Sequence, residues 1–268
     1  MGPALLFCPA DRPDRFAKAA ERADAVILDL EDAVAPSDKP AARAAVARSA
    51  LDPLRTIVRV NAAGSGELEA DLAALAATGY RTVMLAKTSG ADDVARCVGY
   101  DVVALVETAL GVHRVGEIAA ADGVVALMWG AEDLTASLGG TSSRDGHGRY
   151  REVGRYARSA VLVAAGAHGR AAIDAVHLDI ADVEGLAAEA ADARASGYAA
   201  TACIHPSQVA VVREAYRPTA AEVSWARDVL AAAEGVTGVF RWQGGMVDEP
   251  VLRQAERTLR HAEPEVSP

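Results

Sequence analysis

The sequence predicts a closed (β/α)8 barrel with a short C-terminal helical extension. Short apolar runs alternate with alanine-rich segments of helical period, which is typical of repeated βα units around a parallel sheet. The runs number eight and are apolar almost throughout, as expected of strands covered on both faces. No GxGxxG motif follows the first run, so a closed barrel, which needs about 250 residues, suits the 268 residues better than an open doubly wound sheet.

Each apolar run is assigned to one strand, and the helices fall between the strands. The predicted strands are ALLFCP (4–9), AVILDL (25–30), TIVRVN (56–61), TVMLAK (82–87), VVALVET (102–108), VVALMW (124–129), AIDAVHL (172–178) and ATACIH (200–205). The predicted helices are 14–23, 40–50, 68–79, 114–122, 153–169 and 183–197, several of which end at a glycine in the expected C-cap position.

The chain continues beyond the eighth strand. Residues 207–216 and 221–235 have helical character, and VFRWQGGMVDEP (239–250) follows them. We therefore predict a barrel domain over residues 1–217 and an extension over residues 218–268, with a disordered tail in HAEPEVSP (261–268).

Composition excludes several classes of function. The 51% hydrophobic content is enough for a sizeable core, and the net charge of −10 without a Lys/Arg cluster argues against a nucleic-acid surface. Three scattered cysteines form no CxxC pair, which favours a reducing cytoplasm. No apolar run approaches the length of a membrane span. We expect a cytoplasmic protein that binds neither nucleic acid nor membrane.

Charged residues gather where the predicted strands end, and a barrel carries its active site at those ends. Carboxylates crowded together repel one another unless a cation lies among them, and oxygen ligands without a Cys or His set favour Mg²⁺ over zinc. The residues at the strand ends are Asp29, Glu31, Asp32, Arg59, Asn61, Lys87, Glu107, Glu132, Asp133, His177, Asp179 and His205.

Several of these residues also have a purely structural interpretation. Asp133 is placed to be the N-cap of the next helix. His205 either contacts substrate or closes the barrel top through a hydrogen bond in the core, and both alternatives stay open. His177 and Asp179 are expected on one face of the seventh strand, in a structural role. The glycine-rich loop 138–150 has basic residues suited to a CoA phosphate, but its composition is also that of an ordinary flexible loop.

Seven ordered motifs resemble one family over nearly the whole chain. The sequence is similar to the citrate lyase β-subunit-like branch of the HpcH/HpaI aldolase superfamily, which includes malyl-CoA, citramalyl-CoA and related 3-hydroxyacyl-CoA lyases. The motifs are FCPADRPDRFAKA (7–19), VILDLEDAV (26–34) with KPAAR (39–43) after it, VRVNAAG (58–64), VALVETALG (103–111), WGAEDL (129–134), CIHPSQ (203–208) and GGMVDEP (244–250).

The resemblance implies a Mg²⁺-dependent barrel, usually a trimer or a dimer of trimers, that reversibly cleaves a carbon–carbon bond beside a thioester. By motif, Glu107 and Asp133 would ligate Mg²⁺ and Arg59 would bind substrate oxygens. Asp248 would be the catalytic carboxylate and would reach a neighbouring subunit's site, so the extension is expected to pack on that subunit. The further residues expected to bind substrate are Glu31, Asp32, Lys87, Gly130, Ala131, Glu132 and His205.

We therefore expect a Mg²⁺-dependent lyase that converts a 3-hydroxyacyl-CoA, such as malyl-, citramalyl- or 3-hydroxy-3-methylglutaryl-CoA, into an acyl-CoA and a small keto acid. One alternative is a citrate lyase β-subunit that acts on citryl-acyl carrier protein, and a more distant one is an inactive binding or structural subunit. Relatives often read PK followed by Glu where this chain has LAKTSG (85–90), which leaves the role of Lys87 open. Asp248 also has the alternative of capping the final helix.

Overall fold

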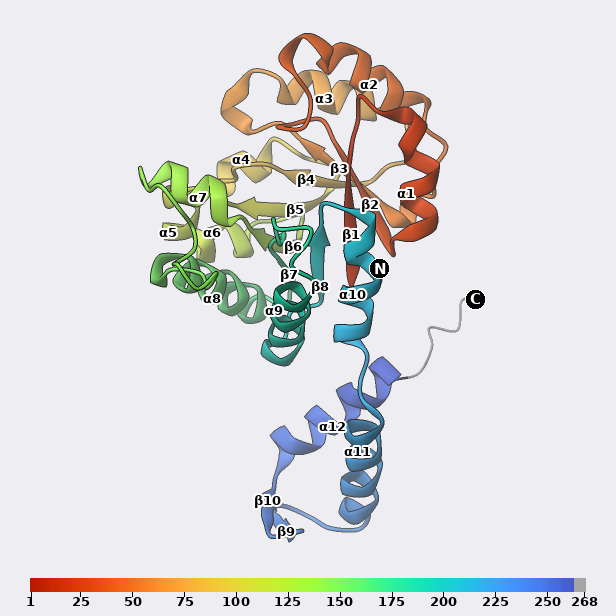
Figure 1. Ribbon diagram of the computed structural model, residues 1–268, viewed down its shortest axis with the longest axis vertical. Coiled ribbons are helices and arrows are strands. Elements are labelled where there is room, and N and C mark those ends of the chain that lie inside the picture. The colour runs from red at the N-terminus through yellow and green to blue at the C-terminus, as the bar shows by residue number, and fades with distance from the viewer. Residues whose placement is uncertain (263–268) are drawn as a thin grey trace. The chain divides into compact units, whose positions relative to one another are not determined.

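The computed structural model describes residues 1–262, and its first part is a closed eight-stranded barrel (Figure 1). The strands lie in chain order and pair in parallel, and β8 closes the barrel against β1. Their bounds are β1 Ala4–Pro9, β2 Ala25–Asp29, β3 Thr56–Val60, β4 Thr82–Leu85, β5 Asp101–Val106, β6 Val124–Trp129, β7 Ala171–Asp174 and β8 Ala200–Cys203. The predicted barrel and its eight strands are confirmed.

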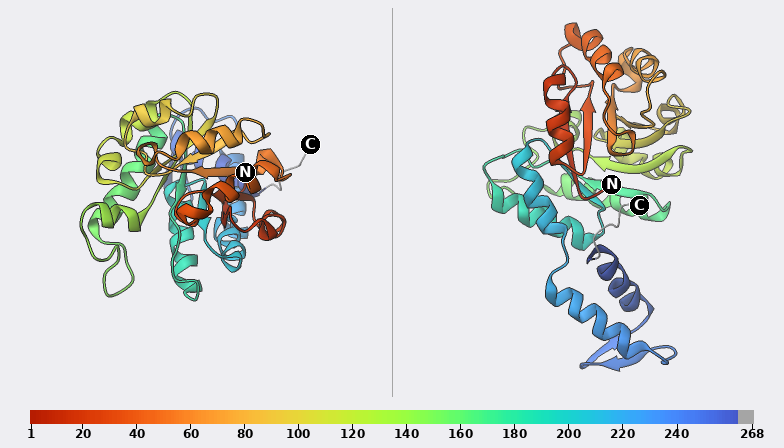
Figure 2. Two further views of the ribbon diagram at one scale, coloured as in Figure 1. Left: turned by 90° about the horizontal axis from the view of Figure 1, so that it is seen from above. Right: turned by 90° about the vertical axis from the view of Figure 1, so that its right-hand side faces the viewer.

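Helices follow the strands and surround the barrel, as the three views show (Figures 1 and 2). Their bounds are α1 Phe16–Arg22, α2 Lys39–Arg48, α3 Leu68–Leu75, α4 Ala91–Ala95, α5 Ala109–His113, α6 Val115–Ala120, α7 Ala131–Ser137, α8 Glu152–Ala167, α9 Val183–Ser196 and α10 Pro206–Tyr216, with 3-10 turns at Pro13–Arg15, Pro36–Asp38, Pro53–Arg55 and Ala63–Ser65. No helix was assigned from the sequence to α4 and α5, and at α7 only a possible N-cap at Asp133 was noted. These short segments offer few positions at which a helical period can be read.

Several predicted strands extend past the observed strand ends, and the seventh does so most. β7 ends at Asp174, so His177 and Asp179 lie in the loop after the strand, and the expectation that they share a strand face is wrong. The barrel interior below these strand ends is filled by side chains from successive strands, among them Leu5, Ile57 and Met84, each at most 2% exposed. A filled interior leaves only the barrel mouth for a ligand.

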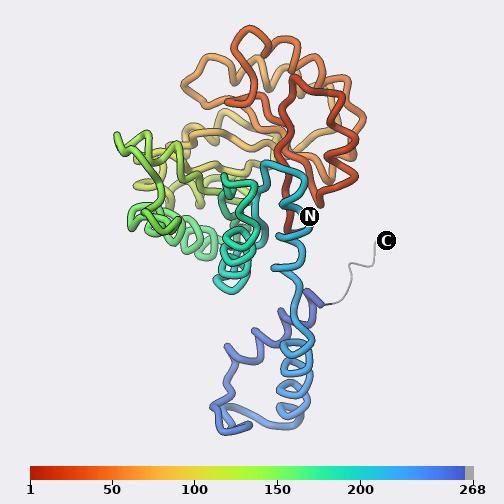
Figure 3. Tube along the Cα trace, viewed as in Figure 1, coloured from red at the N-terminus to blue at the C-terminus, as the bar shows by residue number. Residues whose placement is uncertain are grey.

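The chain divides into two compact units, Met1–Ala215 and Tyr216–Pro268 (Figure 3). In the second unit, α11 (Ala220–Ala233) and α12 (Glu249–Ala262) enclose a small core of their own that includes Ala226, Val229 and Val247. Thr219 and Glu222 form a capping box at the start of α11.

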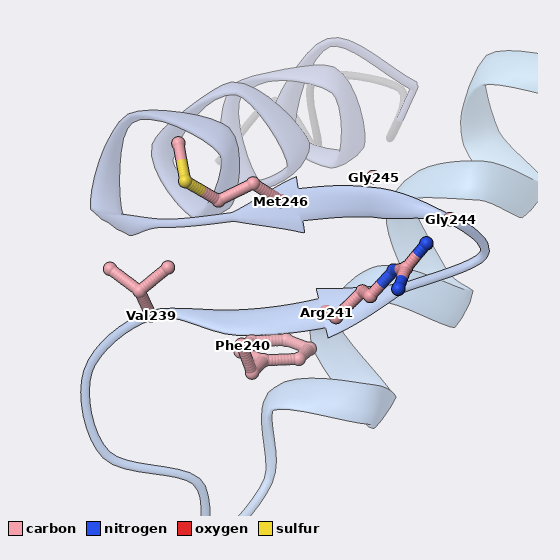
Figure 4. A pocket seen from close by; sticks show the side chains of 6 residues that line it. All are labelled: Val239, Phe240, Arg241, Gly244, Gly245 and Met246. Carbon is pink, nitrogen blue, oxygen red and sulfur yellow. The ribbon is translucent and has the colours of Figure 1, made fainter.

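A two-stranded hairpin joins these helices and was not predicted, since three-residue strands show no readable alternation. It consists of β9 (Phe240–Trp242) and β10 (Gly245–Val247). Gln243 and Gly244 form the turn with φ of 46° and 83°, as a two-residue hairpin turn requires. The hairpin carries an open hollow, and the side chains that line it are shown in Figure 4.

Two further expectations concern the surface and the end of the chain. Over residues 1–262, no helix is both long and apolar enough to cross a membrane. Of the tail predicted to be disordered, His261 and Ala262 belong to α12, and residues 263–268 lie outside the described residues.

Candidate active site

A buried ion pair lies at the ends of β2 and β3. Asp29 and Arg59 face each other in register on these strands. The carboxylate of Asp29 accepts hydrogen bonds from Nε and Nη2 of Arg59, at 2.7 and 2.6 Å, and Nη1 lies 3.4 Å from Glu31. Burial lowers the pKa of Arg59, but the nearby carboxylates of Asp29 and Glu31 raise it by more, so the guanidinium stays charged. The ion pair thus fixes a cation at the barrel mouth.

Lys87 connects the acidic strand ends to one another. Its ammonium group contacts Glu31, lies 2.8 Å from Asp32 and lies 3.4 Å from Asp133. The residue has a positive φ of 51°, which is uncommon for a side chain other than glycine, and its backbone N–H donates to Oε1 of Glu107 at 3.0 Å. Lys87 therefore lies at the centre of the charge network that the sequence left open.

Burial perturbs the carboxyl groups of this network to different extents. Glu31 is 6% exposed, and burial raises its pKa against the opposing charges of Arg59 and Lys87. Asp32 is more exposed. Its partial burial also raises its pKa, but the hydrogen bond and positive charge of Lys87 have the larger effect, and the pKa of Asp32 is lowered. The two neighbouring acids thus differ in how readily they ionise.

Glu107 is the most strongly perturbed acid of the site. It follows β5 and is 3% exposed. Burial, followed by the negative charge of Asp133, raises the pKa of Glu107 to about 8. Gly130 leaves the space for this side chain, because a Cβ at residue 130 would lie 2.7 Å from Oε2 of Glu107.

Asp133 and Glu132 lie in the first turn of α7, directly after β6. The N-cap of this helix is Gly130, so the alternative that Asp133 is the N-cap is wrong, and its side chain is free to face Lys87. Glu132 instead accepts a hydrogen bond of 2.5 Å from the hydroxyl of Ser143. That contact fastens the loop after α7 to the rim.

An open cleft of about 300 Å³ lies in the barrel mouth beside Arg59. Its polar lining residues are Asp29 and Arg59, and the guanidinium lies 4.9 Å from the ring centre of Phe7. The remaining lining residues are apolar: Pro9, Ala33, Leu105, Met128, Val176 and Ile204. The cleft thus combines one fixed cation with a mostly apolar wall.

Comparison with known proteins identifies the family. The sequence profile of the HpcH/HpaI aldolase/citrate lyase family matches residues 4–206, which is most of the chain. The chain belongs to this family. Mitochondrial citramalyl-CoA lyase of Rattus norvegicus is 31% identical over 290 residues, which cover 96% of this chain and 84% of that protein.

Two solved structures from Mycobacterium tuberculosis are similar to this member of the HpcH/HpaI family. CitE in complex with magnesium, acetoacetate and coenzyme A is 59% identical, with a TM-score of 0.94 over 97% of this chain and 98% of that one. A citrate lyase beta subunit complexed with oxaloacetate and magnesium is 61% identical, with a TM-score of 0.80 over 81% of this chain and 97% of that one.

The carboxylates Glu107 and Asp133 suit Mg²⁺ that takes only some of its ligands from the protein. Over residues 1–262, no three His, Cys, Asp or Glu side chains are arranged as a ready metal cage. Mg²⁺ ordinarily takes one or two carboxylates and completes its shell with water and substrate oxygens. The mutual repulsion of Glu107 and Asp133 is what a cation between them would relieve.

The sequence placed Asn61 at the rim but did not predict Lys39 and Asp71, which with Asn61 hold the acidic loop after β2. The buried ammonium of Lys39 donates to the carbonyls of Leu30 and Glu31, at 2.8 and 3.1 Å, and to Oδ1 of Asn61 at 2.6 Å. Asp71, fully buried, accepts from the backbone and the side chain of Asn61. A lysine inside the otherwise apolar face of α2 is the only local signal, and it does not specify these partners.

A second buried network lies beside β7. His177 is 5% exposed, and its Nδ1 lies 2.8 Å from Oε2 of Glu189, which also pairs with Arg144 of the loop 138–150. The hydrogen bond to Glu189 raises the pKa of His177 despite its burial. Arg144 in turn lies 3.8 Å from the ring centre of Tyr150, which contacts Trp129 edge-on. This network anchors the loop whose Ser143 bonds to Glu132.

Two remaining candidates lie in local capping positions. His205 is exposed, and its Nδ1 interacts with the hydroxyl and backbone N–H of Ser207, so its imidazole makes no hydrogen bond in the core. Its backbone N–H does donate to the buried side chain of Gln208, at 3.2 Å. Asp248 lies in the second unit, directly before α12, where its Oδ1 accepts from the backbone N–H of Val251 at a long 3.4 Å. Ala131 is the first residue of α7.

Proposed function

We propose that the chain is a Mg²⁺-dependent carbon–carbon lyase that cleaves a 3-hydroxyacyl-CoA into an acyl-CoA and a small keto acid. Malyl-, citramalyl- and 3-hydroxy-3-methylglutaryl-CoA are the substrate types that we expect. Family membership and the citramalyl-CoA lyase relative support the reaction class. The relative bound to magnesium, acetoacetate and coenzyme A supports the combination of ligands.

One observation carries the proposal. Glu107 and Asp133 are two carboxylates close enough for the charge of one to raise the pKa of the other, and they lie at the same barrel mouth as the fixed cation Arg59. Bound between them, Mg²⁺ would chelate the alcohol and carboxylate oxygens of the substrate and make the hydroxyl more acidic.

The reaction needs three changes at the substrate. The 3-hydroxyl loses its proton, the oxygen electrons form a carbonyl as the C2–C3 bond breaks, and the electron pair of that bond passes to a thioester enolate that takes a proton at C2. Arg59 would stabilise the enolate oxygen, and its two hydrogen bonds to Asp29, which hold the guanidinium in one orientation, support this role. Lys87 contributes positive charge against Glu31 and Asp133 and so orders the acidic rim.

Asp248 is the acid–base group that we propose for C2, supplied to the site of a neighbouring subunit in a homotrimer. In that role the hydrogen bond to Val251 would hold the carboxylate in place without consuming both oxygens. Mixing inactive Asp248→Asn chains with inactive Glu107→Gln chains should then restore part of the activity, since some sites would combine intact residues from two chains. No recovery after verified subunit exchange would contradict action across subunits. A variant that loses stability but keeps its rate would show that Asp248 is only a helix cap.

The function is tested by incubating the purified protein and Mg²⁺ with a panel of 3-hydroxyacyl-CoA esters and following release of acetyl-CoA. Malyl-, citramalyl- or 3-hydroxy-3-methylglutaryl-CoA should be cleaved, while free citrate should not. Glu107→Gln and Asp133→Asn should each weaken Mg²⁺ binding and reduce cleavage severely in a folded protein. Activity only on citryl-acyl carrier protein would replace the proposal by the citrate lyase β-subunit function. Activity that survives EDTA would overturn the metal assignment.

A further inference from the structure

We propose that the cleft beside Arg59 selects keto acids with an uncharged alkyl chain, including chains longer than a methyl group, over keto acids with a second carboxylate. This inference rests on the proposed lyase function and names the substrate class within it. The residues that carry it are the apolar lining residues of the cleft, above all Ala33, Met128, Val176 and Ile204.

The size of the cleft exceeds what a methyl group needs. Its volume of about 300 Å³ corresponds to roughly ten water-sized groups at about 30 Å³ each. Glu107 and Asp133, the expected metal ligands, are not among its lining residues, whereas Arg59 is, so the reacting carbon is expected where the cleft opens at the rim. The volume is therefore available to a substituent of that carbon.

The end of the substrate that enters the cleft follows from size. The CoA arm is far too large for this volume and must stay at the open rim. The end remote from the thioester, which becomes the keto acid, is then directed inward. Its side chain would then meet Leu105 and Met128, which line the cleft and are 2% and 3% exposed.

The charges around the cleft disfavour a second carboxylate. Arg59 is the cation among the lining residues, and it already pairs with Asp29 at 2.6 Å and with Glu31 at 3.4 Å. A substrate carboxylate inside the cleft would lose water against apolar carbon and would also face Asp29. An alkyl chain of the same shape would instead gain from leaving water.

The test uses the condensation direction, in which a proton leaves C2 of acetyl-CoA, the C2–C3 bond forms at the keto carbon and the carbonyl oxygen takes a proton. The keto acids are glyoxylate, pyruvate, 2-oxobutyrate, 4-methyl-2-oxopentanoate and oxaloacetate, with kcat/KM measured for each. Each added carbon from glyoxylate to 2-oxobutyrate should raise kcat/KM about fourfold. Oxaloacetate should be at least tenfold poorer than 4-methyl-2-oxopentanoate, its apolar counterpart of similar shape.

Two variants at the cleft wall make the test sharper. Ile204→Lys adds a cation and should improve oxaloacetate relative to 4-methyl-2-oxopentanoate by at least tenfold. Ala33→Leu narrows the cleft and should reduce use of 4-methyl-2-oxopentanoate at least tenfold more than use of pyruvate. Ala35→Leu, an exposed substitution on the same loop but outside the lining, should leave the ranking unchanged.

The outcomes separate the inference from the function on which it rests. If no keto acid condenses with acetyl-CoA, the lyase function fails and the inference falls with it. If pyruvate condenses but glyoxylate or oxaloacetate is the best substrate, the inference alone is overturned. The inference would also be overturned if the order of kcat/KM among the keto acids stayed the same in both Ile204→Lys and Ala33→Leu. In that case the cleft would not hold the side chain of the keto acid.

Discussion

Replacing Gly130 with alanine should weaken Mg²⁺ binding while leaving the fold intact. Gly130 has an extended backbone with φ of −127°, which alanine adopts without strain. The obstacle is Glu107, since the new Cβ would lie 2.7 Å from its Oε2 and 2.9 Å from its Cβ. The Cβ of Glu107 is tied to the backbone of a buried segment and cannot swing aside as a flexible side-chain end would.

The size of the effect follows from these distances. To reach an ordinary contact of 3.4 Å, Glu107 must move by about 0.5–0.7 Å. A misplacement approaching 1 Å at a reacting site costs up to about a hundredfold in rate. Overpacking of a filled interior costs about 1–3 kcal/mol of stability. We therefore expect Gly130→Ala to lose about 10–100-fold in Mg²⁺ affinity and in kcat/KM.

The assay is calorimetric titration of Mg²⁺ together with thermal unfolding. Gly116→Ala is the matched control, because Gly116 lies within α6 and a Cβ there would meet nothing within 4 Å. That control should bind Mg²⁺ as the wild type does and be slightly more stable, by about 0.5–1 kcal/mol. A folded Gly130→Ala protein with unchanged Mg²⁺ affinity would refute the assignment of Glu107 as a ligand held by the space at Gly130.

Three further predictions concern the residues around the site. The hydrogen bond to Glu189 raises the pKa of His177 above its ordinary value of 6.5. The protonated imidazole therefore stabilises the fold fully below pH 6.5, and this stabilisation is lost as the pH rises through the pKa that His177 has in the folded protein. Urea unfolding should therefore show that His177→Gln is more destabilising at pH 6 than at pH 9, and an equal cost at both would contradict it. Arg59→Lys should lower kcat/KM at least about a hundredfold, because an ammonium cannot keep the two-point contact of the guanidinium; steady-state kinetics within tenfold of wild type would exclude that role. Lys39→Met removes three hydrogen bonds of a buried ammonium and should cost about 2–4 kcal/mol of unfolding free energy in urea, whereas exposed Lys18→Met should cost little.

The pattern of apolar runs determined the barrel. Eight strands buried on both faces, separated by helical segments, have few arrangements other than a closed parallel sheet, so the order of the elements was predictable from local sequence. The hairpin at 240–247 and the short helices α4, α5 and α7 were not predictable in this way. These helices are shorter than the window of about 11 residues over which hydrophobic periodicity is read, and the three-residue strands are too short to show alternation.

The same division holds for the candidate site. The sequence determined which charged residues follow the strands. Since the strand ends of a barrel share one rim, these residues were expected to lie near one another. Only the tertiary structure decided which of them pair, Arg59 with Asp29 and Lys87 with Glu31, and that Ser143 of a distant loop bonds to Glu132. The raised pKa of Glu107 was likewise decided by the tertiary structure, because it results from burial of the carboxyl group and from the nearby charge of Asp133. These properties depend on distances between strands, and distances between strands exist only once the barrel has closed.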